Sequence, residues 1–287
     1  RHHAFDSEKL SLALMSIPLF LFMVMFSYVP LWGGVLAFFR YYPGLKLSEI
    51  EYVGFKYFRE LFNSVSDFPM IIRNTLAFSA LGILVSFAPA ILAIMLNEVR
   101  RNSFKRVVQT TTTLPNFISW ILVYAVFFAI FSVHDGMFNR VLLKLGLISS
   151  PTNVLATERI VWFFQAGVTI WKTLGWNAII YLAAISALDV ELYEAAAIDG
   201  AGRWRQFRHI TFPGVLPTTM ILLIFAMAGL LSTNFDQIYN LQNDVIILDI
   251  NTINVYTYRT GVLGRKYSIA TAVGLFQGGV NCLMLLG

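Results

Sequence analysis

Charged residues are scarce in this chain of 287 residues: Asp, Glu, Lys and Arg together make up 13% of it, against about 25% in soluble domains. Hydrophobic residues reach 57%. The chain has a single cysteine, Cys282, so no disulfide can form within it. These proportions exclude an ordinary soluble domain and predict an integral membrane protein.

The sequence motifs of common enzymes and of nucleotide binding are also missing. We find no G-x-x-x-x-G-K-[ST] phosphate-binding loop, no G-x-S-x-G elbow and no H-E-x-x-H helix. The histidines, at positions 2, 3, 134 and 209, lack the spacing of a metal site. We therefore expect a protein that is not an enzyme by itself and that holds no cofactor or metal. Tyr193, Glu194 and Asp199 are interpreted as solvated loop residues rather than acid–base groups.

The formal net charge of +5 could point to nucleic acid as a partner. The basic residues, however, stand in short groups beside long apolar runs, as they do at the solvated ends of membrane helices. The lipid bilayer is the expected partner, and nucleic acid is not.

Long apolar runs recur along the chain. A membrane-spanning helix needs about 20 mostly apolar residues, whereas the strands of a membrane barrel alternate over about 10. The sequence therefore predicts an all-α, polytopic membrane protein with about six spans. They cover residues 10–39 (with Pro18 and Pro30), 75–96, 117–132, 160–188, 213–231 and 267–286.

Residues 55–62, between the first two spans, have an amphipathic helical pattern. One face carries apolar residues and the opposite face charged ones: Phe55, Phe58, Leu61 and Phe62 against Lys56, Arg59 and Glu60. An interfacial helix and an ordinary surface helix explain the pattern equally well.

Two short loops concentrate basic residues on one side of the membrane. The first holds Arg100, Arg101, Lys105 and Arg106, and the second holds Arg203, Arg205 and Arg208. On the other side the basic residues are spread over longer loops, and short loops carry the positive-inside rule. We expect the dense side to be cytoplasmic and, with six spans, both termini to be cytoplasmic as well.

Residues 189–213 form a polar island between two apolar spans. Asp189 can cap a helix start, Glu191 suits the first turn, and Gly200 can supply a turn with positive φ. A second short, basic helix is expected over 202–209. The pattern predicts a rigid helix-turn-helix that projects from the membrane, although a helix lying flat on the bilayer fits the same residues.

The island closely resembles the EAA loop of permease subunits in binding-protein-dependent ABC importers. That loop reads E-A-A, three residues, Gly, nine residues, then I-x-L-P. The matching positions here are Glu194, Ala195, Ala196, Gly200, Ile210 and Pro213, and Phe212 stands where Leu is usual. Stretches 52–58, 73–75 and 114–119 are similar to maltose-type permeases, and stretch 28–33 to the branch that imports oligosaccharides.

This resemblance implies a type I importer permease: one transmembrane domain, 1–287, with a core at 71–287 and a cytoplasmic coupling loop at 189–213, in the bacterial inner membrane. The chain would form half of the path for an oligosaccharide. The implied partners are a second homologous permease, two ATPase subunits that bind ATP and Mg, and an extracytoplasmic solute-binding protein. Coupling to the ATPase falls to Glu194 and Gly200, with Ala195, Ala196 and Asp199 beside them. Loops 40–73 and 234–266 are candidates for docking the binding protein, with plain solvated loops as the alternative.

Polar residues inside the spans are candidates for lining the path, because such residues are costly in lipid. The fourth span offers five on one helical face: Gln165, Thr169, Lys172, Thr173 and Trp176. Asn234, with Ser232, Thr233 and Asp236, forms a second group, and Gln277 and Asn281 mark the sixth span. Hydrogen bonds between helices are the more common role of such residues.

Lys172 lies about a dozen residues from either end of its span. We hypothesise that this cation favours acidic sugars such as uronate oligomers, because charge attraction is strong where the dielectric constant is low. Pairing with an acidic residue of a neighbouring permease explains it equally well. For Trp176, stacking on a sugar ring competes with ordinary helix packing.

Two other classes of protein remain open at this point. An ion-driven secondary transporter would show inverted repeats and broken helices, and a non-transporting membrane scaffold would use the polar island only for docking.

Overall fold

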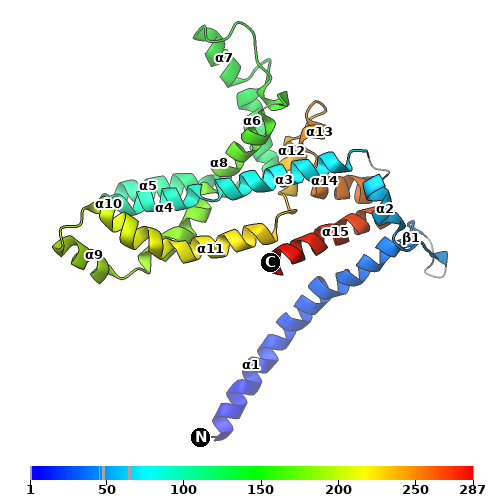
Figure 1. Ribbon diagram of the computed structural model, residues 1–287, viewed down its shortest axis with the longest axis horizontal. Helices are drawn as coiled ribbons and strands as arrows, with labels where there is room; N and C mark the ends of the chain where they lie inside the picture. Colours follow the sequence, from blue (N-terminus) through cyan, green and yellow to red (C-terminus); the bar gives the residue numbers. More distant parts are fainter. Residues whose placement is uncertain (1, 45, 47–48, 64–65, 159, 287) are drawn as a thin grey trace. The chain divides into compact units, whose positions relative to one another are not determined.

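The structure, a computed structural model, describes residues 2–44, 46, 49–63, 66–158 and 160–286. Helices make up nearly all of its regular structure, and the strands in the described residues form a single short pair (Figure 1). The predicted all-α class is therefore confirmed. The chain divides into two compact units, Arg1–Ser66 with Tyr256–Gly278 and Asp67–Val255 with Gly279–Gly287.

The first unit begins with a long interrupted helix. α1 (His2–Met23) continues into the π-helix η1 (Val24–Tyr28) and the 3₁₀-helix η2 (Val29–Phe38). Pro30 cannot donate a backbone hydrogen bond, and just before it the N–H of Val29 bonds back to Val24 O, a π-type bond. The apolar span Lys9–Phe38 agrees with the prediction for 10–39.

A short hairpin and helix α2 follow this span. Strand β1 (Phe39–Arg40) pairs antiparallel with β2 (Glu51–Tyr52), and α2 covers Lys56–Asn63. The predicted amphipathic helix is thus present, and only part of its apolar face is buried within the protein. Tyr57 and Leu61 are buried, while Phe55 and Phe62 remain mostly exposed.

The first unit is completed by the π-helix η7 (Arg259–Leu263) and most of α15 (Tyr267–Leu286), the predicted sixth span. Gly261 is required there, since a Cβ at that position would lie 2.6 Å from the Cβ of Ala270. Ser268 fastens β1 by donating to Phe39 O (2.6 Å) and accepting from Tyr41 N (3.0 Å).

The second unit contains three long spans. α3 (Phe68–Val85) and α4 (Ala88–Glu98) form the span Phe68–Glu98, and α8 covers Val161–Ser186. The third, Arg203–Ala228, consists of α10 (Arg203–Gln206), the π-helix η6 (Phe207–Thr211) and α11 (Phe212–Ala228). α8 packs against α3, α4 and α11 (Figure 1). A core of Ala93, Ala178, Tyr181, Ile185 and Val215 joins α4, α8 and α11.

The predicted third span, 117–132, is wrong as a single helix. α6 (Trp120–Phe131) has only 12 residues, too few to cross a bilayer alone. It joins α5 (Asn102–Thr113) and the 3₁₀-helix η4 (Leu114–Phe117) through a bend of 107°. Within the described residues, five helical stretches are long and apolar enough to span a membrane, or six if the bent pair counts as one. The polar, amphipathic character of α5 led us to expect a loop there.

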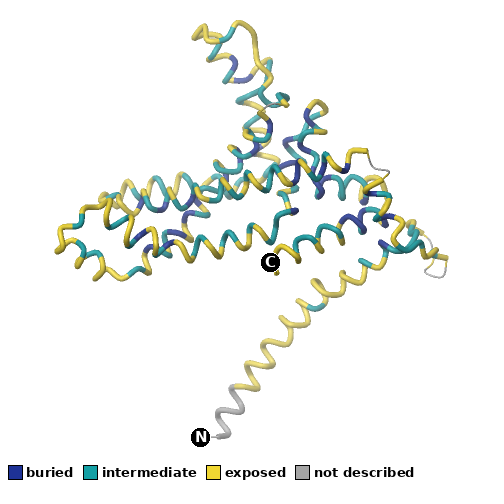
Figure 2. Tube along the Cα trace, in the orientation of Figure 1, coloured by how far each residue is buried: buried dark blue, intermediate teal, exposed yellow. Residues whose placement is uncertain are grey.

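The stretch 234–266 is also not the solvated loop that was one expectation. It folds into α12 (Phe235–Leu241), α13 (Ile247–Ile250), α14 (Ile253–Tyr258) and η7. Ile238, Ile246, Ile250 and Val255 are buried with Val161 of α8 in a second core, visible as dark segments in Figure 2. After α6, the chain forms α7 (Met137–Lys144) and the 3₁₀-helix η5 (Val154–Ala156), which both contact α6.

Candidate functional site

The polar island forms the helix α9 (Val190–Ile198), whose two ends are closed as the sequence predicts. Asp189 Oδ1 accepts a hydrogen bond from Glu191 N (2.9 Å), which confirms the N-cap. At the other end Gly200 has φ +74°. Its N–H bonds to Ala197 O (3.1 Å), and Ala201 N bonds to Ala196 O (2.8 Å), the two bonds of a Schellman motif. α9 therefore stops in a fixed direction.

α9 contains no buried residue (Figure 2). Glu194, Ala195, Asp199 and Gly200 are all exposed, and Ala196 is half-buried. Apolar side chains lie open beside them, above all Ile198, which is 86% exposed. Water is a poor neighbour for such a surface, so its arrangement suits contact with another protein or with the surface of the bilayer.

The expected second short helix, 202–209, is not separate. It is the first part of the span Arg203–Ala228, entered through the N-cap Gly202. The π-helix η6 lies just before Pro213, whose missing N–H removes a regular helical bond. Tyr193 Oη of α9 bonds to Thr211 Oγ1 of η6 (2.9 Å). α9 is thus tied directly to a membrane helix.

A cavity of about 350 Å³ lies between α3, α8, α11 and α12. Of the predicted path residues, it brings together Gln165 and Thr169 of α8 and Asn234, the N-cap of α12. Neutral polar side chains complete its polar lining: Ser79, Ser232, Thr233 and Gln237. The lining contains no charged side chain among the described residues. Such a site can exchange hydrogen bonds with hydroxyl groups without fixing a charge.

Two buried amides organise one wall of this cavity. Gln237 Nε2 donates to Gln165 O (2.8 Å) and to Gln165 Oε1 (3.0 Å). Thr169 Oγ1 donates to Gln237 Oε1 (2.9 Å). Gln237 was missed in the sequence because it lies outside every predicted span. Its neighbours Ile238 and Leu241 were the available signal, since with Gln237 they recur at helical spacing.

Lys172 does not line the cavity. It is 6% exposed, and its Nζ donates to the carbonyls of Pro115 (3.1 Å), Asn116 (2.9 Å) and Ile118. An ammonium group has three protons, so all of them are engaged. The Trp120 ring lies 5.3 Å from Nζ. This geometry supports a structural role, with backbone carbonyls in place of an acidic residue from a neighbouring subunit.

The carbonyls that Lys172 binds stand at the bend between α5 and α6. The end of a helix leaves carbonyl groups without helical partners and carries partial negative charge. A buried cation satisfies both features. α5 can approach α8 closely there because residue 175 is glycine: a Cβ at Gly175 would come within 2.3 Å of the Thr112 carbonyl carbon.

The remaining two predicted path residues lie elsewhere. Thr173 borders a smaller cavity of about 90 Å³ between α3, α4 and α8. Trp176 packs edge-on against Phe117 at 5.7 Å, which supports ordinary packing. The five α8 residues share one face of the helix, but that face meets α3 and α12 on one side and the α5–α6 bend on the other. Of the five, Gln165 and Thr169 line the larger cavity, whereas Lys172, Thr173 and Trp176 do not.

Asn281 of α15 makes two hydrogen bonds to the segment that follows α11, a structural role close to the expected bonds between helices. Its Oδ1 accepts from Leu231 N (3.0 Å), and its Nδ2 donates to Ser232 Oγ (2.9 Å). The polar residues that follow α11 are thus held in place from α15.

A helical membrane protein with a cavity between its spans that carries uncharged polar side chains, and with an exposed, tightly capped loop helix, has the features of a transport permease. Comparison with known proteins agrees: residues 81–276 match the family "Binding-protein-dependent transport system inner membrane component". The chain belongs to this family and is a multi-pass permease of ABC importers.

Two relatives come from Bacillus subtilis (strain 168), and each is 38% identical over 96% of this chain. They are Protein LplB, matched over 86% of its length, and the polygalacturonan/rhamnogalacturonan transport system permease protein YteP, matched over 85%. The sequence resemblance to carbohydrate importer permeases is confirmed.

Solved structures show the same fold. A chain from a bacterial ABC transporter involved in the import of the acidic polysaccharide alginate matches with a TM-score of 0.88 and 32% identity, over 100% of this chain and 96% of that one. The alginate transporter in complex with alginate pentasaccharide-bound periplasmic protein matches equally well, over 98% and 93%. The expected type I permease fold is confirmed.

Proposed function

We propose that this chain forms half of the translocation path of an ATP-driven importer of oligosaccharides. The observation that carries the proposal is the cavity between α3, α8, α11 and α12, largely apolar but with a group of uncharged polar side chains, found in a chain of the permease family. Amide and hydroxyl groups of Gln165, Thr169 and Asn234 are suited to the hydroxyl groups of a sugar. A second homologous permease would supply the other half.

In this proposal α9 couples the path to a cytoplasmic ATPase subunit. Its support is geometric: the helix is exposed, capped at both ends and bonded to the span Arg203–Ala228. Glu194, Ala195, Ala196, Asp199 and Gly200 form the docking surface. ATP and Mg are bound by two partner ATPase subunits rather than by this chain. The α9 side is cytoplasmic and both termini lie on that side.

Transport then proceeds by alternating access. ATP binding draws the ATPase subunits together, α9 moves with them, and the path opens to an extracytoplasmic binding protein that delivers the sugar. Coupling of this kind is reciprocal for binding free energies, so a loaded binding protein favours the ATP-bound state.

The proposed substrate class is an oligosaccharide with acidic units. The names of two relatives support it, one a polygalacturonan/rhamnogalacturonan permease and the other a subunit of an alginate importer. Lys172 does not support this substrate class, because its ammonium group binds three backbone carbonyls and is not free to bind a sugar carboxylate. Selection of an acidic sugar therefore falls to the binding protein or the partner permease.

An ion-driven transporter and a scaffold are the alternatives. Broken helices occur in secondary transporters, and the α5–α6 bend is one, but family membership favours the importer. The decisive experiment uses the chain in proteoliposomes with its partner permease, ATPases and binding protein. We expect uptake of galacturonate oligomers to require ATP and to survive a proton ionophore. Uptake abolished by the ionophore, or no uptake with ATP, would overturn the proposal.

Coupling is tested in the same preparation with Glu194→Ala. We expect loss of the ATPase activity that the loaded binding protein stimulates, with normal insertion and pairing of the permeases. Glu191→Ala, also exposed on α9 but outside the E-A-A positions, is the matched control. Equal stimulation in both variants would remove the coupling assignment.

A further inference from the structure

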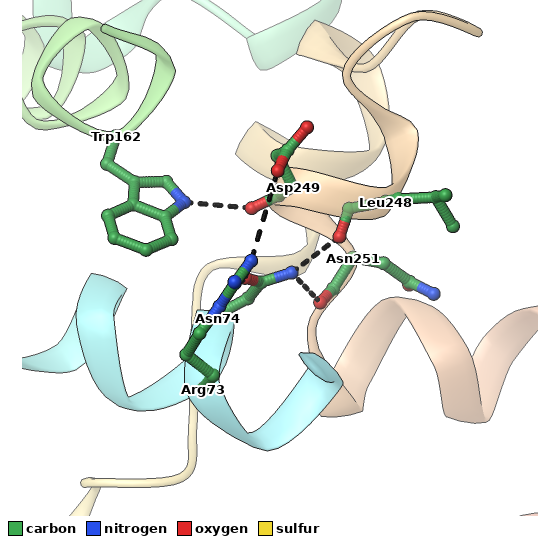
Figure 3. Close-up of polar contacts among 6 residues, drawn as sticks. All are labelled: Arg73, Asn74, Trp162, Leu248, Asp249 and Asn251. Atoms are coloured by element: carbon green, nitrogen blue, oxygen red, sulfur yellow. Dashed lines mark hydrogen bonds and ion pairs between the residues drawn. The ribbon is translucent and has the colours of Figure 1, made fainter. Parts of the chain in front are cut away.

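The first turns of α3 hold a buried amide that fastens a distant segment. Asn74 is fully buried, and its Nδ2 donates to the carbonyls of Leu248 (2.7 Å) and Asn251 (3.2 Å). Its Oδ1 accepts from Arg73 through Nε (3.3 Å) and Nη2 (3.0 Å). Both ends of the amide are thus specified, and Arg73 fixes which way it points (Figure 3).

Arg73 and Trp162 hold the same segment from two sides. The Arg73 guanidinium lies 3.9 Å from Asp249 Oδ1 and 5.4 Å from the centre of the Trp162 ring. Trp162 Nε1 donates to Asp249 O (2.8 Å). Three elements that are far apart in the sequence, α3, α8 and α13, meet at this point (Figure 3). We name residues 248–254 the strap.

The strap is in turn bonded to the cavity wall. Thr75 Oγ1 accepts from Ile253 N (3.0 Å) and keeps the strap on α3. Further along, Thr233 Oγ1 donates to Thr252 Oγ1 (3.0 Å), and Asn254 Nδ2 donates to Thr233 O (2.8 Å). Thr233 lines the cavity together with its neighbours Ser232 and Asn234.

We propose that Asn74 and Arg73 are positioning residues for transport. Through the strap they hold the Ser232–Thr233–Asn234 wall of the cavity in place and keep its outer side closed. Neither residue lines the cavity; each acts through carbonyl groups and side chains of the strap. The inference rests on the proposed function, in which the cavity belongs to the path.

The placement of the strap fits closure on the side opposite α9. Trp162 stands in the first turn of α8, whereas α9 follows the last turn. α8 has 26 residues, so its ends lie about 39 Å apart at 1.5 Å per residue. Gln165 and Thr169, within two turns of the strap end, face the cavity. The cavity therefore lies toward the strap end of α8, although no residue of the strap is part of its lining.

Two features of the strap weaken its attachment to the rest of the unit. Asn251 Oδ1 is buried and accepts no hydrogen bond from the described residues. The Arg73–Asp249 pair is partly exposed, and solvent weakens such pairs. The Asn74 amide donates two hydrogen bonds to the strap, and Thr75 Oγ1 accepts one from it.

The test uses Asn74→Asp, which keeps the shape of the side chain but replaces the donor by a second acceptor that faces two carbonyls. Cys282 is the only cysteine of the chain, so Cys282→Ser gives a cysteine-free background. Ser232→Cys then reports on the cavity wall. Right-side-out proteoliposomes of the full importer are treated with a membrane-impermeant maleimide added outside, without nucleotide.

Asn139→Asp is the matched control. Asn139 is also buried, and its Nδ2 likewise donates to two carbonyls, of Ser132 (3.1 Å) and Thr152 (3.0 Å), but it holds the α6–α7 region. We expect Asn74→Asp to raise the labelling rate of Ser232→Cys about tenfold, equivalent to about 1.4 kcal/mol of lost closure. Asn139→Asp should leave it within about twofold of the parent, a shift of well under 1 kcal/mol.

Unchanged labelling in Asn74→Asp, or an equal rise in both variants, would overturn the inference. If Asn74→Asp does not assemble, Asp249→Asn tests the same strap. We expect it to raise the labelling rate of Ser232→Cys by less than tenfold. An unchanged labelling rate would overturn the inference. ATP-driven uptake by the parent importer is measured in parallel. Parent uptake with unchanged labelling refutes the strap alone, whereas absent parent uptake refutes the proposed function.

Discussion

Helices α8 and α9 are separated by only a few residues, yet α8 buries polar side chains whereas α9 exposes apolar ones. α8 buries Gln165 and Lys172 inside a membrane protein and gives each of them hydrogen-bond partners. α9 buries nothing and leaves apolar side chains such as Val190 and Ile198 in the open.

The difference follows from what surrounds each helix. A polar group next to lipid is costly, so α8 turns such groups inward, where they hold neighbouring helices and line a cavity. α9 stands outside the apolar spans, and its open apolar surface gains stability only when a partner covers it. Substitutions in α8 should therefore act on the chain itself, and substitutions in α9 on its complexes.

Lys172→Met should have the largest effect. It leaves the carbonyls of Pro115, Asn116 and Ile118 without their cation, and buried acceptors left unpaired cost about 1–3 kcal/mol each. We expect the permease to lose about 3 kcal/mol or more of stability. Size-exclusion chromatography of heated, detergent-solubilised protein measures this loss. Lys144→Met, the same change at an exposed lysine of α7, is the control.

This prediction separates the two roles considered for Lys172. Normal thermal stability in Lys172→Met, combined with selective loss of uptake for acidic sugars, would show that Lys172 contacts the substrate. Equal destabilisation by Lys144→Met would show that the change is not specific to the α5–α6 bend.

Gln237→Leu should have the next largest effect. It removes the donor to the buried Gln165 Oε1 and one polar group from the cavity, at a cost of about 1–3 kcal/mol. We expect a moderate loss of thermal stability and a raised KM for uptake by the reconstituted importer. Asn240→Leu, on the same helix, is the control, because among the described residues its amide donates to Asp236 O within α12 and is not part of the cavity lining. An unchanged KM would remove Gln237 from the path.

The sequence predicted α9 well because its determinants are local. Asp189 and Gly200 act on backbone groups within a few residues, and capping chemistry can be recognised from residue type and spacing. The sixth span, 267–286, was predicted without error for the same reason, as one uninterrupted apolar run.

The lining of the cavity was predicted only in part, because its arrangement depends on contacts distant in sequence. The position of Lys172 on its helical face does not predict that its ammonium group contacts the α5–α6 bend, which lies more than fifty residues earlier in the chain. Gln237 was overlooked because α12 is too short to resemble a span. Helical periodicity fixes the direction of a side chain, but not which element it will meet.

On the α9 side, Gly200→Val should weaken coupling more than stability. No atom lies within 4 Å of a Cβ built at Gly200, so the penalty comes from the backbone, about 1–2 kcal/mol for a side chain at positive φ. We expect normal insertion but reduced ATPase stimulation by the loaded binding protein. Gly200→Asn should retain most of it, because Asn tolerates this conformation. Equal loss in both variants would point to direct contact rather than backbone direction.

Asp189→Ala should have the smallest effect of the series. The substitution removes one hydrogen bond, from Glu191 N, at the exposed start of α9. Loss of such a cap costs about 1 kcal/mol, and fraying of the first turn leaves the Gly200 end and the Tyr193–Thr211 bond in place. Hydrogen exchange should therefore speed up several-fold at amides 190–193, since 1.4 kcal/mol corresponds to a factor of about ten. Asp189→Asn preserves an accepting oxygen and should exchange like the parent chain. If Asp189→Ala instead abolished ATPase stimulation while Asp189→Asn preserved it, the first turn of α9 would itself have to be part of the docked surface. The contrast between a helix stabilised from within and one completed by a partner would then extend along the whole of α9.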